Sequence, residues 1–297
     1  MEIGMIGLGK MGGNMVTRLI KGGHKVVAYD RSPDAVKAAA SQGAVGANTL
    51  EELVQKLKPP RAAWVMVPSG APTEDTVKAL AALMQSGDII IDGGNSKYTD
   101  DARRAGELAK IGIQYMDAGT SGGVWGLKLG YCLMVGGEKK TFDHLEPIYK
   151  TLAPENGYAY MGLHGAGHFV KMIHNGVEYA MMQSYAEGFD IMKASGFKLD
   201  IARIADLWMQ GSVVRSWLLE LGANALKDNP NLDGIKPFVN DSGEGRWTVE
   251  AAVELGIPAP AITAALFARF ESRQDDSFAM KYLNALRNQF GGHTIVK

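Results

Sequence analysis

Short apolar runs alternate with helix-like segments through the first half of the chain. The apolar runs lie at residues 3–6, 25–29, 62–67, 88–91 and 113–116, with another pair at 131–135 and 158–160. Parallel strands need long crossover connections, and helices between the strands supply them. The alternation therefore predicts an α/β, Rossmann-like, doubly wound sheet.

The pattern changes after Gly162. From His164 to about Ala194 the chain has no proline and keeps one helical pattern, whereas a typical helix has about 10 to 14 residues. The remainder is also helical in pattern, apart from a loop near residues 228–246. We therefore predict an N-terminal α/β domain at residues 1–163 and an all-helical C-terminal domain at residues 164–297.

The composition argues against several classes of partner. The formal net charge is −1 in 297 residues, so we expect neither nucleic acid nor an anionic membrane as a partner. No apolar run reaches about 18 residues, the length that a membrane span needs. We expect no signal peptide, and the single cysteine, Cys132, lies in an apolar run. We expect a cytoplasmic protein in which Cys132 packs in a buried strand.

The glycine-rich segment Gly7-Leu8-Gly9-Lys10-Met11-Gly12 follows the first apolar run and opens a helical pattern. Glycines there allow a tight turn and the close approach of a pyrophosphate to a helix N-terminus. The alternative is a strand-to-helix turn with no ligand. We favour a dinucleotide site because the expected strand, helix and second strand all surround the motif.

Asp30 ends the second apolar run, 18 residues after Gly12. An acidic side chain at this point accepts hydrogen bonds from a ribose hydroxyl and repels a 2′-phosphate, which favours NAD. Arg31 leaves NADP open, because it could hold that phosphate; otherwise it is a solvated charge that stacks on adenine. Val67, at the end of the third run, is expected to line the same cofactor site.

Two further glycine-rich segments follow predicted strands: Asp92-Gly93-Gly94-Asn95-Ser96 and Gly119-Thr120-Ser121-Gly122-Gly123. Ligands of open α/β sheets bind beyond the carboxyl ends of the strands. We therefore expect Asn95 and Ser96 to contact a ligand, although either could simply cap the next helix. The second segment exposes backbone amides suited to a carboxylate, or else forms a plain turn.

Four polar residues recur at helical spacing in the long helix: Lys171, His174, Asn175 and Glu178. Spacing of i, i+3, i+4 and i+7 places them on one face, and the surrounding residues are apolar. A buried polar face is unfavourable unless its groups meet each other or a ligand. Lys171 and Glu178 are about 10.5 Å apart along the axis, which suits a six-carbon substrate between them. The alternative is a structural network or a solvated face.

With these motifs the chain resembles the 6-phosphogluconate dehydrogenase (decarboxylating) family of the β-hydroxyacid dehydrogenase superfamily, from Met1 to His293. The superfamily marks are Gly7 to Gly12 and Gly22-Gly23-His24. The family marks are Asp92-Gly93-Gly94-Asn95-Ser96, His174-Asn175-Gly176-Val177-Glu178-Tyr179, Gly245-Arg246-Trp247-Thr248 and Arg287-Asn288-Gln289-Phe290-Gly291-Gly292-His293. The chain is similar to the short bacterial form, which has roughly half of the long enzymes' helical domain.

The resemblance implies oxidative decarboxylation of 6-phosphogluconate to ribulose 5-phosphate and CO2 with NAD or NADP. It implies that Lys171 is the general base and later acid, and that Glu178 protonates the enediol. The implied contacts of the sugar acid are Asn95, Ser121, Gly122, Gly123, His174 and Asn175, and those of its phosphate are Tyr179, Arg269 and Arg287. His293 would reach a neighbouring subunit's active site, so the helical domain also serves a homo-oligomer. Burial of Lys171 would lower its pKa toward the value that a base needs.

The chain departs from the long enzymes at two positions. Val124 stands where they carry Glu, and Asp241-Ser242-Gly243 stands where they carry a phosphate-contacting Lys. We expect no metal site, because no metal-ligand spacing of His, Cys or Asp appears. Two alternatives stay open: a non-decarboxylating relative such as a 3-hydroxyisobutyrate dehydrogenase, and a nicotinamide-binding module without turnover.

Overall fold

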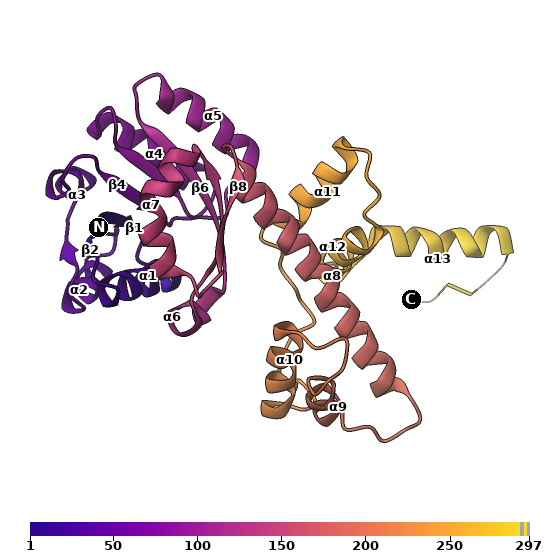
Figure 1. Cartoon of the computed structure of the whole chain (residues 1–297). Coiled ribbons are helices and arrows are strands. Elements are labelled where there is room, and N and C mark those ends of the chain that lie inside the picture. The colour runs from indigo at the N-terminus through magenta and orange to yellow at the C-terminus, as the bar shows by residue number, and fades with distance from the viewer. Residues whose placement is uncertain (292–293, 296–297) are drawn as a thin grey trace. The chain divides into compact units, whose positions relative to one another are not determined.

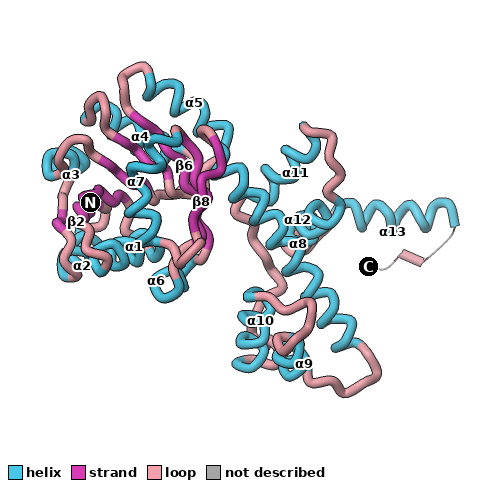
Figure 2. Tube along the Cα trace, viewed as in Figure 1, coloured by secondary structure: helices cyan, strands magenta, loops and turns pink. Residues whose placement is uncertain are grey.

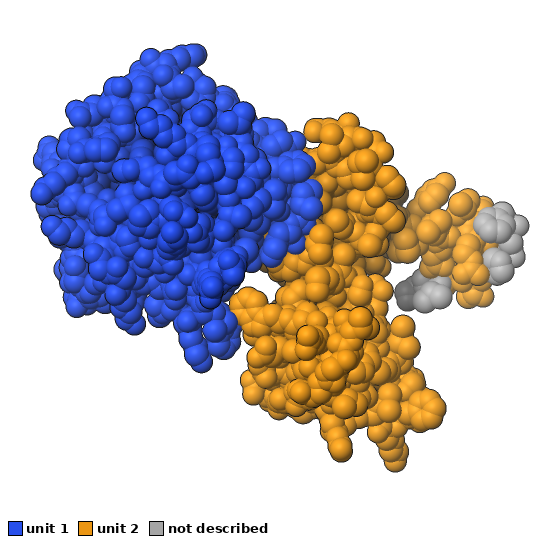
Figure 3. Space-filling view, viewed as in Figure 1, with its two compact units in different colours: residues 1–174 blue, residues 175–297 orange. Residues whose placement is uncertain are grey.

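The computed structural model describes residues 1–291 and 294–295 of the chain. They form two compact units, Met1–His174 and Asn175–Lys297, shown in blue and orange in Figure 3. The boundary between the units falls inside helix α8 (Ala166–Ala194), which is continuous through it.

Unit 1 is built on an eight-stranded sheet with the order β3-β2-β1-β4-β5-β6-β7-β8. The strands are β1 Glu2–Ile6, β2 Lys25–Tyr29, β3 Val45–Gly46, β4 Ala62–Val65, β5 Ile89–Asp92, β6 Gln114–Ser121, β7 Cys132–Gly137 and β8 Tyr158–Gly162. All neighbours pair in parallel except β6 and β7, which are antiparallel. The order reverses after β3-β2-β1, which is the doubly wound arrangement that the sequence predicts.

Helices cover both faces of this sheet (Figure 1). They are α1 Lys10–Lys21, α2 Pro33–Ser41, α3 Leu50–Lys56, α4 Ala71–Leu83, α5 Tyr98–Ala109, the 3₁₀ turn Gly123–Trp125, α6 Gly126–Leu129 and α7 Lys139–Leu152. Successive strand residues pack into opposite cores: Ile89 and Ile91 lie with α1 and α7, whereas Ile90 lies with α3, α4 and α5. Strands buried on both faces explain the unbroken apolar runs of the sequence.

Two expectations for the end of the sheet need correction. β6 continues to Ser121 instead of ending near Met116, because its second half pairs with the antiparallel strand β7. Cys132 does begin β7, but its side chain is exposed and not packed in the core. The apolar run correctly indicates a strand here, while the exposure of its first residue depends on where the strand starts.

In the described part of unit 2 the structure is helix and loop, as Figure 2 shows. After α8 come α9 Ile201–Trp208, α10 Trp217–Asp228, α11 Glu244–Glu254, α12 Pro260–Glu271 and α13 Phe278–Gly291. α9 and α10 pack on α8 through Ala205, Leu219 and Ala223 with the stacked rings of Phe189 and Trp208. The predicted loop near residues 228–246 separates α10 from α11. None of the described helices is both long and apolar enough to cross a membrane.

Candidate active site

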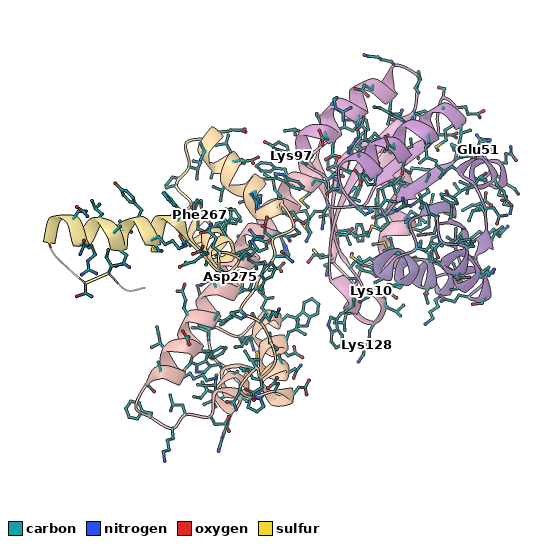
Figure 4. All side chains as sticks on the ribbon, turned by 180° about the vertical axis from the view of Figure 1, so that it is seen from behind. Lys10, Glu51, Lys97, Lys128, Phe267 and Asp275 are labelled. Carbon is teal, nitrogen blue, oxygen red and sulfur yellow. The ribbon has the colours of Figure 1, made fainter. Side chains whose placement is uncertain are left out.

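Glycine is needed at each of the three positions 7, 9 and 12 for a different local reason. Gly7 has φ +91°, and a Cβ there would lie 2.3 Å from the Met66 carbonyl oxygen. A Cβ on Gly12 would lie 2.0 Å from the Gly7 carbonyl oxygen, so Gly12 lets α1 pack against the turn. A Cβ on Gly9 would meet nothing within 4 Å. Gly9, just before Lys10 at the start of α1 (labelled in Figure 4), therefore leaves space that a ligand can take.

Asp30 anchors this turn as well as facing it. Its Oδ2 accepts a hydrogen bond from the Leu8 amide at 2.6 Å, and its Oδ1 accepts one from the Ser32 amide at 2.8 Å. Two backbone amides thus hold the carboxylate in place at the carboxyl end of β2. A fixed carboxylate is a defined acceptor for a ribose hydroxyl and an unfavourable neighbour for a phosphate.

A cavity of about 550 Å³ opens beside the turn. Of the predicted cofactor residues it is lined by Gly7, Gly9, Asp30, Arg31 and Val67. The other predicted cofactor residues, Leu8, Met11, Gly12 and Asn95, are not among its lining residues. The cavity wall also includes Tyr29, Met66, Pro68, Asp75 and Thr76, which the sequence analysis missed. Asp75 and Thr76 lie on α4, the helix after β4. The turn between β4 and α4, which contains Val67, was the sequence signal that could have indicated them.

Alanine at two of these glycines should separate folding from cofactor binding. Gly12→Ala should lower the melting temperature by several degrees, because its Cβ collides with backbone that cannot move freely. Gly9→Ala should leave the melting temperature near that of wild type but weaken dinucleotide binding, because its methyl group projects into open space. Thermal unfolding with and without NADH measures both effects. Equal loss of stability in the two variants would contradict this assignment.

The second half of β6 runs directly against the start of α8. A Cβ on Gly119 would lie 2.4 Å from the Cβ of Lys171, so only glycine lets helix and strand approach this closely. Lys171 is buried, with 6% of its surface exposed. One turn later, His174 Nε2 lies 3.3 Å from the Ser121 hydroxyl. The structure therefore brings together Lys171, His174 and Ser121 at the end of β6.

Gly122 and Gly123 follow Ser121 with φ of +124° and +51° and lead into the 3₁₀ turn. Most side chains avoid these angles, so the two glycines permit the sharp exit from the strand. Val124, where the long enzymes carry Glu, is exposed and offers no charge. The predicted glycine-rich segment is thus half strand and half turn.

The loop after β5 is fixed by the buried carboxylate of Asp92. This carboxylate accepts from the Gly94 amide at 3.0 Å, the Ser96 hydroxyl at 2.6 Å and Arg104 Nη1 at 3.2 Å, and the Tyr115 hydroxyl oxygen lies 3.2 Å from it. Ser96 is buried and its hydroxyl shapes the loop, while its expected contact with a ligand stays a prediction. Asn95 is exposed at the tip of the loop, just before Lys97, which is labelled in Figure 4.

The first turn of α8 is held by two further buried carboxylates. Asp117 in β6 accepts hydrogen bonds from the backbone amides of Gly165 at 2.8 Å and His168 at 3.0 Å. The positive end of the helix dipole, at the N-terminus of α8, also stabilises this carboxylate. His168 Nδ1 lies 2.7 Å from the Asp101 carboxylate, and its Nε2 lies 3.1 Å from the Gly94 carbonyl oxygen. Sequence reasoning missed His168, Asp101 and Asp117. No pattern in the neighbouring residues shows that side chains so far apart in the sequence will contact one another.

Asp92, Asp101 and His168 offer atoms within 4.8 Å of one another, which is a spacing that metal ligands show. Arg104 forms an ion pair with Asp92, and the Tyr115 hydroxyl donates to Asp101 at 2.8 Å. A buried guanidinium supplies the positive charge that a metal would otherwise provide. The cluster is therefore better described as a network of buried ion pairs.

In unit 2, the continuation of α8 presents Asn175, Glu178 and Tyr179. The Asn175 side-chain amide donates to Glu244 Oε1 at 3.0 Å. The Tyr179 hydroxyl accepts from the Ser242 amide at 3.1 Å, and the Ser242 hydroxyl lies 2.5 Å from Glu244 Oε2. Glu178 is half-buried on this face. The segment just before α11 thus folds onto the predicted substrate residues of α8.

The basic residues of unit 2 have unequal surroundings. The Arg269 guanidinium stacks 3.6 Å from the centre of the Tyr179 ring, so these two predicted phosphate contacts adjoin. Hydrogen bonds from Arg246 and Arg273 lower the pKa of the Asp241 carboxyl to about 2. Asp241 lies where this chain departs from the phosphate-contacting lysine of the long enzymes. Arg287 is exposed on α13. His293 lies outside the described residues.

The comparisons with known proteins agree along the whole chain. Residues 2–179 match the family described as the NAD binding domain of 6-phosphogluconate dehydrogenase, and residues 167–289 match its C-terminal domain. The chain belongs to the 6-phosphogluconate dehydrogenase family. The two matches overlap within α8, the helix that carries Lys171 and Glu178. The resemblance inferred from the motifs is therefore confirmed.

Members of this family similar to the chain include short and long proteins. YqeC of Bacillus subtilis is 45% identical over the full length of both chains. The NAD(+)-dependent, decarboxylating 6-phosphogluconate dehydrogenase of Haloferax volcanii is 42% identical and is 99% covered. The structure of the Plasmodium falciparum 6-phosphogluconate dehydrogenase, studied with NADP+ and with 6-phosphogluconate, is 32% identical with a TM-score of 0.84. All of this chain but only 66% of that one is covered, as expected of a short form.

Proposed function

We propose that the chain oxidises 6-phosphogluconate with NAD(P) and decarboxylates it to ribulose 5-phosphate and CO2. The observation that carries the proposal is the polar face of α8, where buried Lys171 packs against Gly119 and Glu178 follows two turns later on the same helix. A buried lysine beside the carboxyl ends of the strands is placed to exchange a proton with a substrate there. Membership in the 6-phosphogluconate dehydrogenase family supports 6-phosphogluconate as the substrate.

The residues present fit a dinucleotide, because the open space at Gly9 and the fixed carboxylate of Asp30 face one cavity. Bound NAD would accept a hydride from C3 of the sugar acid. Lys171 would take the proton of the C3 hydroxyl and, now charged, would polarise the resulting ketone as CO2 leaves. Glu178 would then protonate C1 of the enediol. A carboxyl about 10.5 Å farther along the helix suits a proton delivered to the other end of the reacting carbons.

Binding of the sugar acid is proposed to divide between two groups of residues. Ser121, Gly122, Gly123 and His174, with Asn95 from the loop after β5, would hold the carboxylate and hydroxyl groups in unit 1. In unit 2, Asn175 would also hold the sugar acid, and Tyr179, Arg269 and Arg287 would bind its phosphate. His293 would approach the active site of a neighbouring subunit. The stacking of Arg269 on Tyr179 pre-organises a guanidinium beside a hydroxyl, which is suited to a phosphate.

A preference for NAD over NADP is expected, because the 2′-phosphate of NADP would meet the fixed carboxylate of Asp30. The measurement is kcat/KM with each cofactor and 6-phosphogluconate, with CO2 release followed in parallel. Reduction without CO2 would favour a sister hydroxyacid dehydrogenase, and no reduction would favour a binding module. A clear NADP preference would make Arg31 the deciding contact. Asp30→Asn should lower the ratio of kcat/KM with NAD to kcat/KM with NADP.

We also propose that the active protein is a cytoplasmic homo-oligomer. Large apolar side chains are exposed on the helices of unit 2, including Val253, Phe267 (labelled in Figure 4), Phe278 and Met280. Exposed apolar surface of this extent indicates a protein interface. Sedimentation at micromolar concentration should therefore give at least a dimer. A fully active monomer would contradict the proposal, and with it the idea that His293 serves a neighbour.

A further inference from the structure

We propose that His168 is a positioning residue for the reaction, which sets the loop carrying Asn95 against the turn of α8 that carries Lys171. The proposal rests on the proposed function. His168 is not proposed to contact the substrate. It acts on Asn95 through the carbonyl of the preceding residue, Gly94, and on Lys171 through the helix that both residues share. It is 2% exposed, in the middle of unit 1.

His168 contacts three separate elements through its two ring nitrogens and its backbone amide. Nδ1 contacts Asp101 on α5 at 2.7 Å, and Nε2 contacts the carbonyl oxygen of Gly94 in the loop after β5 at 3.1 Å. The backbone amide of the same residue donates to Asp117 on β6 at 3.0 Å. One residue thus ties the start of α8 to a strand, a helix and a loop at once.

Both partners of the ring are acceptors, a carboxylate and a carbonyl. Satisfying both requires a hydrogen on each nitrogen, so the fitting form is the imidazolium cation. Burial alone would lower the pKa of His168, but the charge of Asp101 and its hydrogen bond raise it above the usual value. The positions of the two acceptors therefore suit a ring that donates from both nitrogens.

The sequence neighbours of these contacts are the predicted active-site groups. Asn95 follows Gly94 directly, and Lys171 stands three residues after His168, on the next turn of α8. Asp92 holds the loop through the Gly94 amide and the Ser96 hydroxyl, and the Gly94 carbonyl of the same loop contacts α8 through His168. Small displacements of groups around a substrate can slow a reaction by about 100-fold, so this register matters for turnover.

Two substitutions can separate the two contacts. In His168→Asn the side-chain nitrogen can replace Nδ1, keeping the bond to Asp101 and losing the one to Gly94. In His168→Gln the nitrogen can replace Nε2, keeping the bond to Gly94 and losing the one to Asp101; both replacements are neutral. His144, exposed on α7, provides matched control variants with the same two replacements.

The proposal predicts opposite rankings for stability and turnover. His168→Asn should lose about 10- to 100-fold in kcat with NAD and 6-phosphogluconate, with a smaller drop in melting temperature than His168→Gln and little change in KM for NAD. Its amides at residues 93–97 should exchange hydrogen faster. His168→Gln should melt at a lower temperature, because a buried carboxylate loses its partner, yet keep most of its kcat. If it folds too poorly to assay, Asp101→Asn tests the same contact with the same expected result.

A purely structural role would lower stability in parallel in both variants and leave kcat per folded enzyme unchanged, which would overturn the proposal. Wild-type kcat and wild-type exchange at residues 93–97 in His168→Asn would overturn it too. So would failure of His168→Asn to fold while His168→Gln folds. Wild-type enzyme without CO2-coupled reduction would instead refute the proposed function, and the exchange measurement would still show whether His168 holds the loop.

Discussion

Lys171→Met should abolish nearly all turnover of 6-phosphogluconate, including the first-turnover burst of NADH. Loss of a positioned base typically lowers a rate by about 100- to 10,000-fold. Here one group would serve both steps, so neither hydride transfer nor loss of CO2 has its proton partner. Methionine has a similar length and no charge, so it should fill the buried position against Gly119 without displacing α8.

The measurement is rapid mixing with absorbance at the NADH band, alongside NADH binding by fluorescence. Binding should stay near wild type, because the dinucleotide cavity has no contribution from Lys171. Lys193→Met, on the exposed last turn of the same helix, is the matched control and should remain active. Near-normal turnover of Lys171→Met would show that the polar face of α8 is structural.

Glu178→Gln should behave differently, with a burst of NADH followed by a slow steady state. Lys171 remains in this variant, so oxidation and loss of CO2 can occur once on each active site. The enediol then waits for a proton that glutamine cannot give. The steady-state rate should fall by about 100-fold or more. This contrast is the sharpest expected difference between the two residues of one helical face.

The burst amplitude should approach one NADH per active site in Glu178→Gln. Glu187→Gln is the control, because Glu187 lies on the same helix, is exposed and contacts Gln183. An absent burst with normal binding and product release would mean that Glu178 acts earlier than the final protonation. A full steady-state rate would remove it from the mechanism.

Local pattern determined most of the architecture. Apolar runs with helical segments between them indicate buried parallel strands, because strands covered on both faces have no polar side. The 29 residues of α8 were evident as a long segment with one period and no proline. The glycine turn was evident too, because its strand, helix and acidic residue lie within one short stretch of chain.

Pairings between distant segments were beyond such reasoning. The length of β6 depends on β7, which pairs with it antiparallel, and no property of residues 117–121 alone reveals that partner. Ser96 was expected to contact a ligand, but its hydrogen bond to Asp92 was not foreseen. The departure at Asp241 was visible, but its place between Arg246 and Arg273 was not.

The sequence by itself determined the fold class, the dinucleotide turn and the face of α8 that bears Lys171 and Glu178, since each follows from periodicity or spacing within one segment. Tertiary structure alone decided what surrounds that face. Gly119 had to meet Lys171, and His168 had to meet Asp101 and Gly94, across 52, 67 and 74 residues of chain. Burial makes such contacts specific, because an unpaired buried charge is costly, and burial arises only when distant segments pack together.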